Sequence, residues 1–496
     1  MLGIRPGNKR RKGFALIYVT MMGAFVLIPM AGLAVDFGML YNVKARLQTA
    51  VDAASIGAGY MLHATTNLSD PVQLAAIQNA AQRYFNANYP THYFGSTIVS
   101  YSAVPASSIS GKTITVNATA TVPMLLMRVL RISQSTVGAM AVSNVRYISM
   151  MIVVDRSGSV FREGAGPTIQ TALSTFVATA STSYLVDGVD TVGMVSFGGT
   201  WRLDFNPTIT FQSGTPNIQT AINNIPFDTG SSTNTAEGLY QAWAQLYKMN
   251  LPGSLNVIVL LTDGRPSAFT SNFTPTTNCT SRVTRGGVLE AYVGLGWPPP
   301  TSGSDISGLF ATIYQGTEAN YLAQPSGGCH YNSNNLNVAD DFSPSNFPNS
   351  VGPVDNVGAS WVPTYTTPGT GLATQSGYYP GPGTSMTNPQ SVRYAAFNAA
   401  DNMATKIRQD TTLAPMLFVI GLNYSNPSEE ALDEDWLARV ANDPNYVTVG
   451  SDTSIVPAGR SVYQSTQTPG MYCNSTMSTL QTCFAQVTSQ LLRLIR

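Results

Sequence analysis

Five oxygen-bearing side chains, from three separate segments, have the types and spacing to bind an ion. They are Asp155, Ser157 and Ser159 in VVDRSGS, Thr233 in SSTNTAEG, and Asp263 in VIVLLTDGRP. In D-x-S-x-S, alternate side chains of a turn offer one carboxylate and two hydroxyls to one point. Hard oxygen ligands with few formal charges suit Mg²⁺, which keeps several waters and accepts only a few protein oxygens. We therefore expect one divalent-cation site, for Mg²⁺ or alternatively Mn²⁺ or Ca²⁺, with an exchangeable position that an acidic group of a partner can occupy.

Both aspartates follow apolar runs that are typical of buried strands. Residues 151–154 and 257–261 are rich in β-branched residues and leucine, and each run ends abruptly in a polar segment. Buried parallel strands have this pattern, and open α/β sheets bind ligands outside the carboxyl ends of their strands. The sequence therefore predicts an α/β fold, a doubly wound and mostly parallel sheet with the ion site at its edge.

These segments, in this order, resemble a von Willebrand factor A (VWA) domain with a metal-ion-dependent adhesion site. The resemblance begins at ISMMIVVDRSGSV and continues through DTVGMVSF (190–197), TNTAEGLYQAW, the TDG segment and PMLFVIGL (415–422). It implies a Rossmann-like domain over residues 149–496. It also implies that Ser157, Ser159 and Thr233 bind the ion directly, while Asp155 and Asp263 bind it partly through water.

The N-terminal region has the pattern of a membrane anchor. A basic leader, residues 1–13, precedes residues 14–35, which carry no charge and would span about 33 Å as a helix, enough to cross a bilayer. The cations before this run place the N-terminus in the cytoplasm. A cleaved secretory signal is the competing interpretation, but its apolar core is shorter, about 7 to 15 residues.

Residues 12–62 resemble the N-terminus of TadG-type proteins, which belong to the Tad (tight adherence, Flp pilus) assembly systems. The residues that carry this resemblance are AGLAVDFGMLYNVKARLQTAVDAASIGAG. It implies a single-pass protein of the bacterial inner membrane with a periplasmic bulk, and pilus components as partners. We expect residues 36–148 to form a small pilin-like α+β module, with a helix at 75–88 and strands at 113–122 and 139–147.

Gly13 and Phe14 follow the basic leader, and Lys12-Gly13-Phe14 resembles the site that prepilin peptidases cut. Tyr18 stands where pilins carry a glutamate, five residues into the mature helix. The sequence allows two interpretations: the chain is cleaved after Gly13, or it remains an uncleaved anchor. Cleavage would allow the chain to be pilus-associated and extracellular.

Four cysteines lie in the exported part of the chain, where an oxidising compartment permits disulfides. Of the three possible connectivities we favour the local one, which pairs Cys473 with Cys483 and Cys279 with Cys329. The other two connectivities and free thiols are the alternatives. The second pair lies in a long irregular insertion, residues 265–390, which is rich in Pro, Gly, Ser, Thr, Asn and Tyr. Loops of this length are usually functional or disordered, so the insertion is either a partner-binding surface or a spacer.

Composition argues against nucleic-acid binding and catalysis. Only 10% of residues are charged, the net charge is zero, and the cations concentrate in the leader rather than in a basic patch. The sequence has three histidines in separate regions and contains no nucleophile elbow, P-loop or H-E-x-x-H motif. We expect a non-enzymatic adhesion or assembly protein of a Tad pilus, such as a minor pilin. The alternative is a membrane-anchored periplasmic assembly factor with no adhesive role, and a metal-dependent hydrolase is a remote third.

Overall fold

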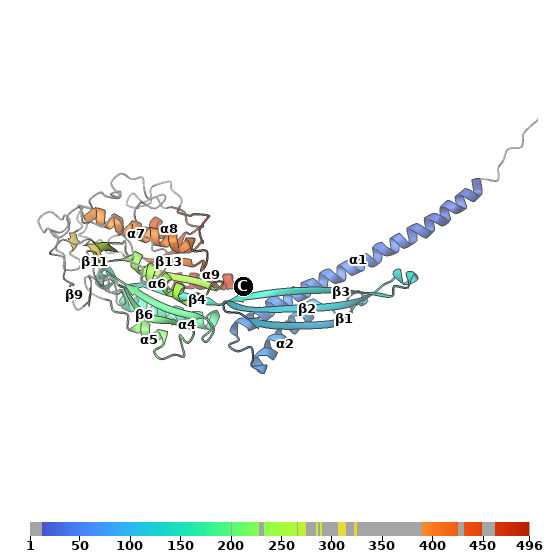
Figure 1. Ribbon diagram of the computed structural model, residues 1–496, viewed down its shortest axis with the longest axis horizontal. Helices are drawn as coiled ribbons and strands as arrows, with labels where there is room; N and C mark the ends of the chain where they lie inside the picture. Colours follow the sequence, from blue (N-terminus) through green and yellow to red (C-terminus); the bar gives the residue numbers. More distant parts are fainter. Residues whose placement is uncertain are drawn as a thin grey trace, which may run out of the picture. The chain divides into compact units, whose positions relative to one another are not determined.

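The chain folds into two compact units, Met1–Val145 and Arg146–Arg496 (Figure 1). In this computed structural model the described residues are 12–199, 201–227, 233–264, 266–273, 284–285, 288–289, 306–313, 322–324, 389–424, 431–448 and 462–495. Residues 1–11 of the basic leader lie outside them. We describe each unit by itself.

The first unit pairs two helices with a three-stranded sheet. Helix α1 (Lys12–Ala64) is continuous, and helix α2 (Pro71–Asn88) follows it. Strands β1 (Thr97–Ser107), β2 (Gly111–Pro123) and β3 (Gln134–Arg146) lie in the order β1-β2-β3. Residues of β2 alternate between buried and half-buried, because a strand directs successive side chains to opposite faces of its sheet.

Helix α1 contains the apolar run of the sequence. Within the described residues one helical stretch is long and apolar enough to cross a membrane, Ile17–Ala64. Gly13 lies in the first turn of α1. Among the described side chains of α1, burial is concentrated in the later part, where Val43, Leu47, Val51 and Ala54 are fully enclosed at the helical spacing that lines one face. Gly32 and Asp36 are buried before it.

The second unit is built on a six-stranded sheet with the order β14-β13-β7-β4-β5-β6. The strands are β4 (Ile148–Asp155), β5 (Thr191–Phe197), β6 (Trp201–Thr208), β7 (Leu255–Thr262), β13 (Met416–Leu422) and β14 (Met471–Ser475). Their neighbours pair in parallel, except for β6, which runs antiparallel to β5. Every residue of β4, β5 and β7 is buried, which explains their continuous apolar runs.

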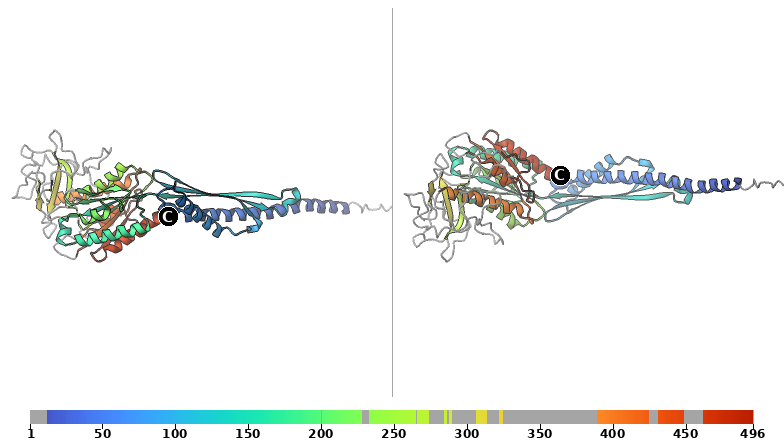
Figure 2. Two further views of the ribbon diagram at one scale, coloured as in Figure 1. Left: turned by 90° about the horizontal axis from the view of Figure 1, so that it is seen from below. Right: turned by 90° about the horizontal axis from the view of Figure 1, so that it is seen from above.

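Helices cover both faces of this sheet (Figure 2). Helices α4 (Gly166–Ser183), α5 (Ile218–Asn223) and α9 (Leu480–Ile495) pack on one face. Helices α6 (Thr235–Met249), α7 (Pro389–Gln409) and α8 (Glu434–Ala441) pack on the other, where Trp243 and Trp436 are fully buried. The expected doubly wound fold is confirmed.

The order of the strands decides where a site can form. The chain leaves β4 through α4 to reach β5 on one side, and later passes through α6 to reach β7 on the other. Connections that diverge from a central strand leave a crevice at the carboxyl ends of the strands. Asp155 is the last residue of β4, and Asp263 directly follows β7.

Strands occur within residues 265–390, which the sequence predicts to be irregular. Strands β8 (Ala268–Phe273), β11 (Ile306–Ile313) and β12 (Leu322–Gln324) form an antiparallel sheet, and β9 (Thr284–Arg285) pairs with β10 (Val288–Leu289). Strands β8 and β11 pair across more than 30 residues of sequence, so their hydrogen-bond partners leave little local signal. The rest of this segment, with Cys279 and Cys329, lies outside the described residues.

A disulfide joins Cys473 in β14 to Cys483 in α9, with their Cα atoms 5.7 Å apart. The two halves of the cystine lie at the sheet edge and on the helix that covers it. The crosslink thereby holds α9 against its strand.

Helix α6 approaches the sheet closely at Gly238, and this contact supports the segment that carries Thr233. A Cβ atom on Gly238 would lie 2.6 Å from Cδ1 of the buried Phe197. We expect Gly238→Ala to lower the free energy of unfolding by about 1–3 kcal/mol through overpacking. Thermal unfolding of the full chain in detergent would measure it. Lys248→Ala, an exposed change on the same helix, should have little effect, and equal stability of the two variants would contradict this packing.

Candidate metal centre

The cluster begins where β4 ends, and two hydrogen bonds fix the Asp155 carboxylate there. The Thr262 hydroxyl, from the end of β7, donates to Oδ2 of Asp155 at 2.6 Å. The backbone N–H of Ser157 donates to Oδ1 at 2.9 Å. This second bond is an Asx turn, which lets the chain reverse at the strand end. The parallel pairing of β4 with β7 brings the Thr262 hydroxyl to the carboxylate that the turn already holds.

Two serine hydroxyls connect this turn to the other aspartate. Oγ of Ser157 lies 3.0 Å from Oγ of Ser159. Both hydroxyls donate to Oδ1 of Asp263, Ser159 at 3.1 Å and Ser157 at 3.4 Å. Four of the five residues expected at the site are therefore linked to one another or share a partner.

Thr233 reaches the same place from the loop before α6. Its N–H donates to Oγ of Ser267 at 3.0 Å, and its carbonyl accepts from the N–H of Ser267 at 2.9 Å. These bonds tie the Thr233 loop to the segment after Asp263. A point at the Cβ position of Gly264 lies 3.8 Å from Oγ of Ser159 and 3.9 Å from Oγ1 of Thr233, so the Thr233 and Ser159 hydroxyls both lie beside this glycine.

The cluster is buried on all but one side. Asp155 is 1% exposed and Asp263 is 4% exposed, whereas Ser159 is half-buried. Burial raises the pKa of Asp155, while the hydrogen bonds from Thr262 and Ser157 oppose this rise. Two carboxylates with oxygen neighbours in a largely dry site favour a cation between them. The donor set therefore fits a hard divalent ion.

Two residues beside the carboxylates were not anticipated. Thr262 holds Asp155 in place, and its one sequence signal is that it directly precedes Asp263 in TDG. Tyr424 follows β13, and its pKa is raised by burial and by the negative charges of Asp263 and Asp155. Its phenol therefore stays neutral next to the carboxylates. The sequence offers no local pattern that would identify Tyr424.

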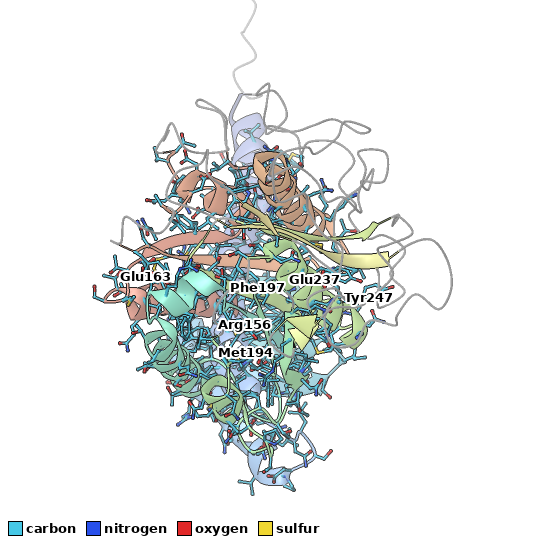
Figure 3. All side chains as sticks on the ribbon, turned by 90° about the vertical axis from the view of Figure 1, so that its left-hand side faces the viewer. Arg156, Glu163, Met194, Phe197, Glu237 and Tyr247 are labelled. Atoms are coloured by element: carbon cyan, nitrogen blue, oxygen red, sulfur yellow. A yellow bond between two sulfur atoms is a disulfide. The ribbon has the colours of Figure 1, made fainter. Side chains whose placement is uncertain are left out.

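Arg156, within the D-x-S-x-S turn, contributes its charge to a different carboxylate. Its backbone N–H donates to the carbonyl of Phe197 at 2.8 Å, which joins the ends of β4 and β5. Figure 3 labels both residues. Burial raises the pKa of Asp204 in β6, and the charges of Arg202 and Arg156 act to lower it. The Arg202 guanidinium lies 3.2 Å from Asp204. Arg156 thus balances buried negative charge at the edge of the sheet.

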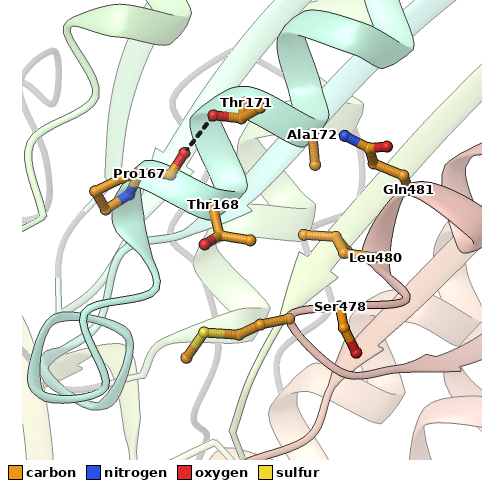
Figure 4. A pocket seen from close by; sticks show the side chains of 8 residues that line it. Pro167, Thr168, Thr171, Ala172, Ser478, Leu480 and Gln481 are labelled. Atoms are coloured by element: carbon orange, nitrogen blue, oxygen red, sulfur yellow. Dashed lines mark hydrogen bonds between the residues drawn. The ribbon is translucent and has the colours of Figure 1, made fainter.

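A separate hollow of about 380 Å³ lies between α4 and the start of α9 (Figure 4). Its lining includes Thr168, Thr171 and Gln481, and the Thr171 hydroxyl donates to the carbonyl of Pro167 at 2.8 Å. None of its lining side chains is ionisable. The hollow therefore offers no acid–base chemistry of its own.

In the part of the chain that the structure describes, no three His, Cys, Asp or Glu side chains gather into a metal-binding group. The candidate centre differs from such groups because three of its five residues carry hydroxyls rather than carboxylates. It has two carboxylates, too few to count as a cluster of acids. Its identification therefore rests on the geometry of the serines and threonines.

Two family models match separate parts of the chain. Residues 149–291 match the von Willebrand factor type A domain, and residues 13–64 match the putative Flp pilus-assembly TadE/G-like family. The resemblances to a von Willebrand factor A domain and to Tad pilus-assembly proteins are thereby confirmed, and the metal-ion-dependent adhesion site stays a prediction. Neither family description is that of an enzyme, in agreement with the expectation of a non-enzymatic protein. No protein with a curated description matches the chain.

Several solved structures are distantly similar. The PilB minor pilin from Streptococcus sanguinis is 13% identical, with 81% of this chain and 80% of that chain covered and a TM-score of 0.36. The vWF domain of the type V pili tip protein Mfa5 from Porphyromonas gingivalis is 14% identical, with 71% and 97% covered and a TM-score of 0.35. The pilus adhesin SpaC from Lactobacillus rhamnosus GG is 12% identical, with 81% and 34% covered and a TM-score of 0.34.

The raised pKa of Asp155 predicts how stability depends on pH. The folded state holds the Asp155 proton more tightly than the unfolded state, so this group stabilises the fold at acid pH and loses that contribution as pH rises through its folded pKa. Asp155→Asn should remove this loss, because the amide stays neutral, its oxygen can accept from the Ser157 N–H, and its NH2 group can donate to the Thr262 hydroxyl. In EDTA, the melting temperature should fall less for the variant than for the parent chain as the pH rises from acid to neutral. An equal fall in melting temperature in both proteins would contradict the burial of an incompletely compensated charge.

Proposed function

We propose that this protein is a pilus-associated adhesion or assembly protein of a Tad (Flp) type system, which binds a partner through a divalent cation. Its matched TadE/G-like segment supports the pilus association, and its matched von Willebrand factor A domain supports the binding role. The observation that carries the proposal is the convergence of Asp155, Ser157, Ser159 and Asp263 at the ends of β4 and β7.

In this proposal the five oxygen-bearing residues hold Mg²⁺, with Mn²⁺ or Ca²⁺ as alternatives. Ser157, Ser159 and Thr233 provide neutral ligands, while Asp155 and Asp263 supply the negative charge. When bound, the cation supplies an open coordination position for an acidic group of the partner. Thr262 positions Asp155 through its hydrogen bond, as supporting residues do around metal ligands. Ser159, the half-buried member, marks the side from which a partner approaches.

The N-terminal helix determines where this binding takes place. The apolar run of α1 crosses the inner membrane with its N-terminus in the cytoplasm and the second unit in the periplasm. If a peptidase cuts between Gly13 and Phe14, the helix instead enters a pilus and the chain becomes a minor subunit outside the cell. The alternative function, an anchored assembly factor without adhesion, uses the uncut chain.

Removal of a carboxylate from the centre should abolish metal binding without unfolding the protein. We expect calorimetric titration of the detergent-solubilised full chain with Mg²⁺ and Mn²⁺ to show one site, which Asp155→Ala and Asp263→Ala lose. Thr262→Val should weaken binding by about 10- to 100-fold, because it removes a supporting hydrogen bond rather than a ligand.

Asp187→Ala is the matched control, since this carboxylate accepts backbone hydrogen bonds from Gln212 and Ser213 instead. It should bind the ion like the parent chain. Metal binding that survives in both Asp155→Ala and Asp263→Ala would refute the proposed centre. Unfolding of those variants in circular dichroism would show that the residues are structural.

Cleavage after Gly13 distinguishes a pilus subunit from a membrane-anchored assembly factor. If the protein is a pilus subunit, mass spectrometry of sheared pili should find a chain that begins at Phe14. If it is an anchored assembly factor, the membrane fraction should contain the leader peptide on the intact chain. A Gly13→Glu variant, which blocks the glycine position, should remain uncut and stay out of the pilus fraction. Its unchanged appearance in sheared pili would exclude this processing step.

A further inference from the structure

A buried acid joins the end of the apolar run in α1 to the turn between β2 and β3. Asp36 is 1% exposed. Its Oδ1 accepts from the N–H of Leu125 at 2.9 Å, and its Oδ2 accepts from the N–H groups of Leu126 at 3.0 Å and Met127 at 2.7 Å. We call residues 124–133, between β2 and β3, the hairpin tip. Three charge-assisted bonds to one carboxylate hold this tip on the helix.

A second contact places the tip beside the apolar run itself. Gly32 lies one turn before Asp36, about 6 Å along the helix axis toward the cytoplasmic end. A Cβ atom on Gly32 would lie 2.8 Å from Cβ of Leu126, so the glycine permits close approach of the tip. Gly32 belongs to residues 14–35, the segment that would span the bilayer. The tip therefore reaches the level of that segment (Figure 1).

The side chains that the tip exposes suit a lipid interface. Leu125, Leu126, Val129 and Ile132 are 56%, 45%, 85% and 44% exposed. Arg128 and Arg131 are exposed among them. Apolar residues with interspersed cations are typical of elements that lie at the boundary between headgroups and acyl chains. Long cationic side chains can bury their stems there and keep their charges at the phosphates.

Helix α1 exposes aromatic side chains near the depth of the hairpin tip. Phe37 and Tyr41 directly follow the apolar run and are 67% and 69% exposed. Aromatic residues are enriched where membrane helices meet water. Because the tip contacts the helix inside its spanning segment, side chains exposed at that depth face lipid when the helix is in a bilayer.

We infer that the hairpin tip is a second membrane attachment, inserted into the interface of the leaflet on the periplasmic side. Leu125, Val129 and Ile132 contact acyl chains, and Arg128 and Arg131 bind phosphates of anionic lipids. This inference rests on the proposed membrane anchoring by α1. With two points of attachment, the first unit can neither slide freely along the membrane normal nor tilt freely against it. The membrane thereby restricts the depth and the tilt of the β1-β2-β3 sheet.

Photo-crosslinking in the full chain tests the depth of the tip. The chain, with p-benzoylphenylalanine at position 129, would be reconstituted in vesicles of phosphatidylethanolamine and phosphatidylglycerol. Position 25, on the apolar run, is the control for the anchor, and Ile109, at the β1–β2 turn, is a control of similar exposure away from the tip; these residues are 74% and 72% exposed. We expect mass spectrometry to find lipid adducts at 25 and 129, and none at 109.

The outcomes separate this inference from the anchor on which it rests. Lipid adducts at 25 without adducts at 129 would overturn the inference and leave the anchor intact. An adduct between 129 and a second protein chain, in place of lipid, would overturn it in favour of a protein interface. Absence of lipid adducts at 25 would overturn the anchor as well.

The Asp36 contact can be tested with the same readout. Asp36→Ala removes the acceptor of three backbone N–H groups, so we expect the loss of lipid adducts at 129 while those at 25 persist. Asp52→Ala is the matched control, because this carboxylate lies on the same helix and accepts from Gln48 instead. Unchanged adducts at 129 in Asp36→Ala would show that the acid does not set the depth of the tip.

Discussion

Two carboxylates are buried side by side at the carboxyl ends of adjacent parallel strands, and this constraint organises the second unit. Asp155 ends β4 and Asp263 follows β7, so the pairing of these strands brings their charges together. Burial of ionised groups is costly unless partners compensate them. The hydroxyls of Thr262, Ser157 and Ser159 supply part of that compensation. A divalent cation would supply the remainder, which relates the proposed function to the electrostatics of the fold.

A comparison with Asp36 in the first unit clarifies this point. Asp36 is equally buried, yet it accepts three backbone N–H groups from the hairpin tip. Backbone donors can satisfy a single carboxylate, and this one fixes one element against another. At the sheet edge, hydroxyls donate to both carboxylates, which face each other's charge. The first arrangement is a structural connection, whereas the second is suited to a ligand.

The central strands and the cluster could be predicted because their signals are local. Apolar runs ending in a polar turn identify β4 and β7, and strand pairing then brings Asp155 and Asp263 together. The edge strand β6 has no such run, since Trp201–Thr208 contains Arg202, Asp204 and a proline. Tyr424 and the strands β8 and β11 depend on contacts between distant parts of the chain. Their positions follow from the register of the sheet, which short-range patterns do not encode.

The central claim is that the five oxygen-bearing residues form one cation site, and anomalous diffraction from crystals grown with Mn²⁺ tests it most directly. The account predicts one strong anomalous peak at the carboxyl ends of β4 and β7, with Ser157, Ser159 and Thr233 within about 2.0–2.5 Å of the ion, in the range of oxygen ligands to hard cations. Asp155 and Asp263 should lie next to it, directly or through water. A peak elsewhere in the second unit, with none between these residues, would contradict the account.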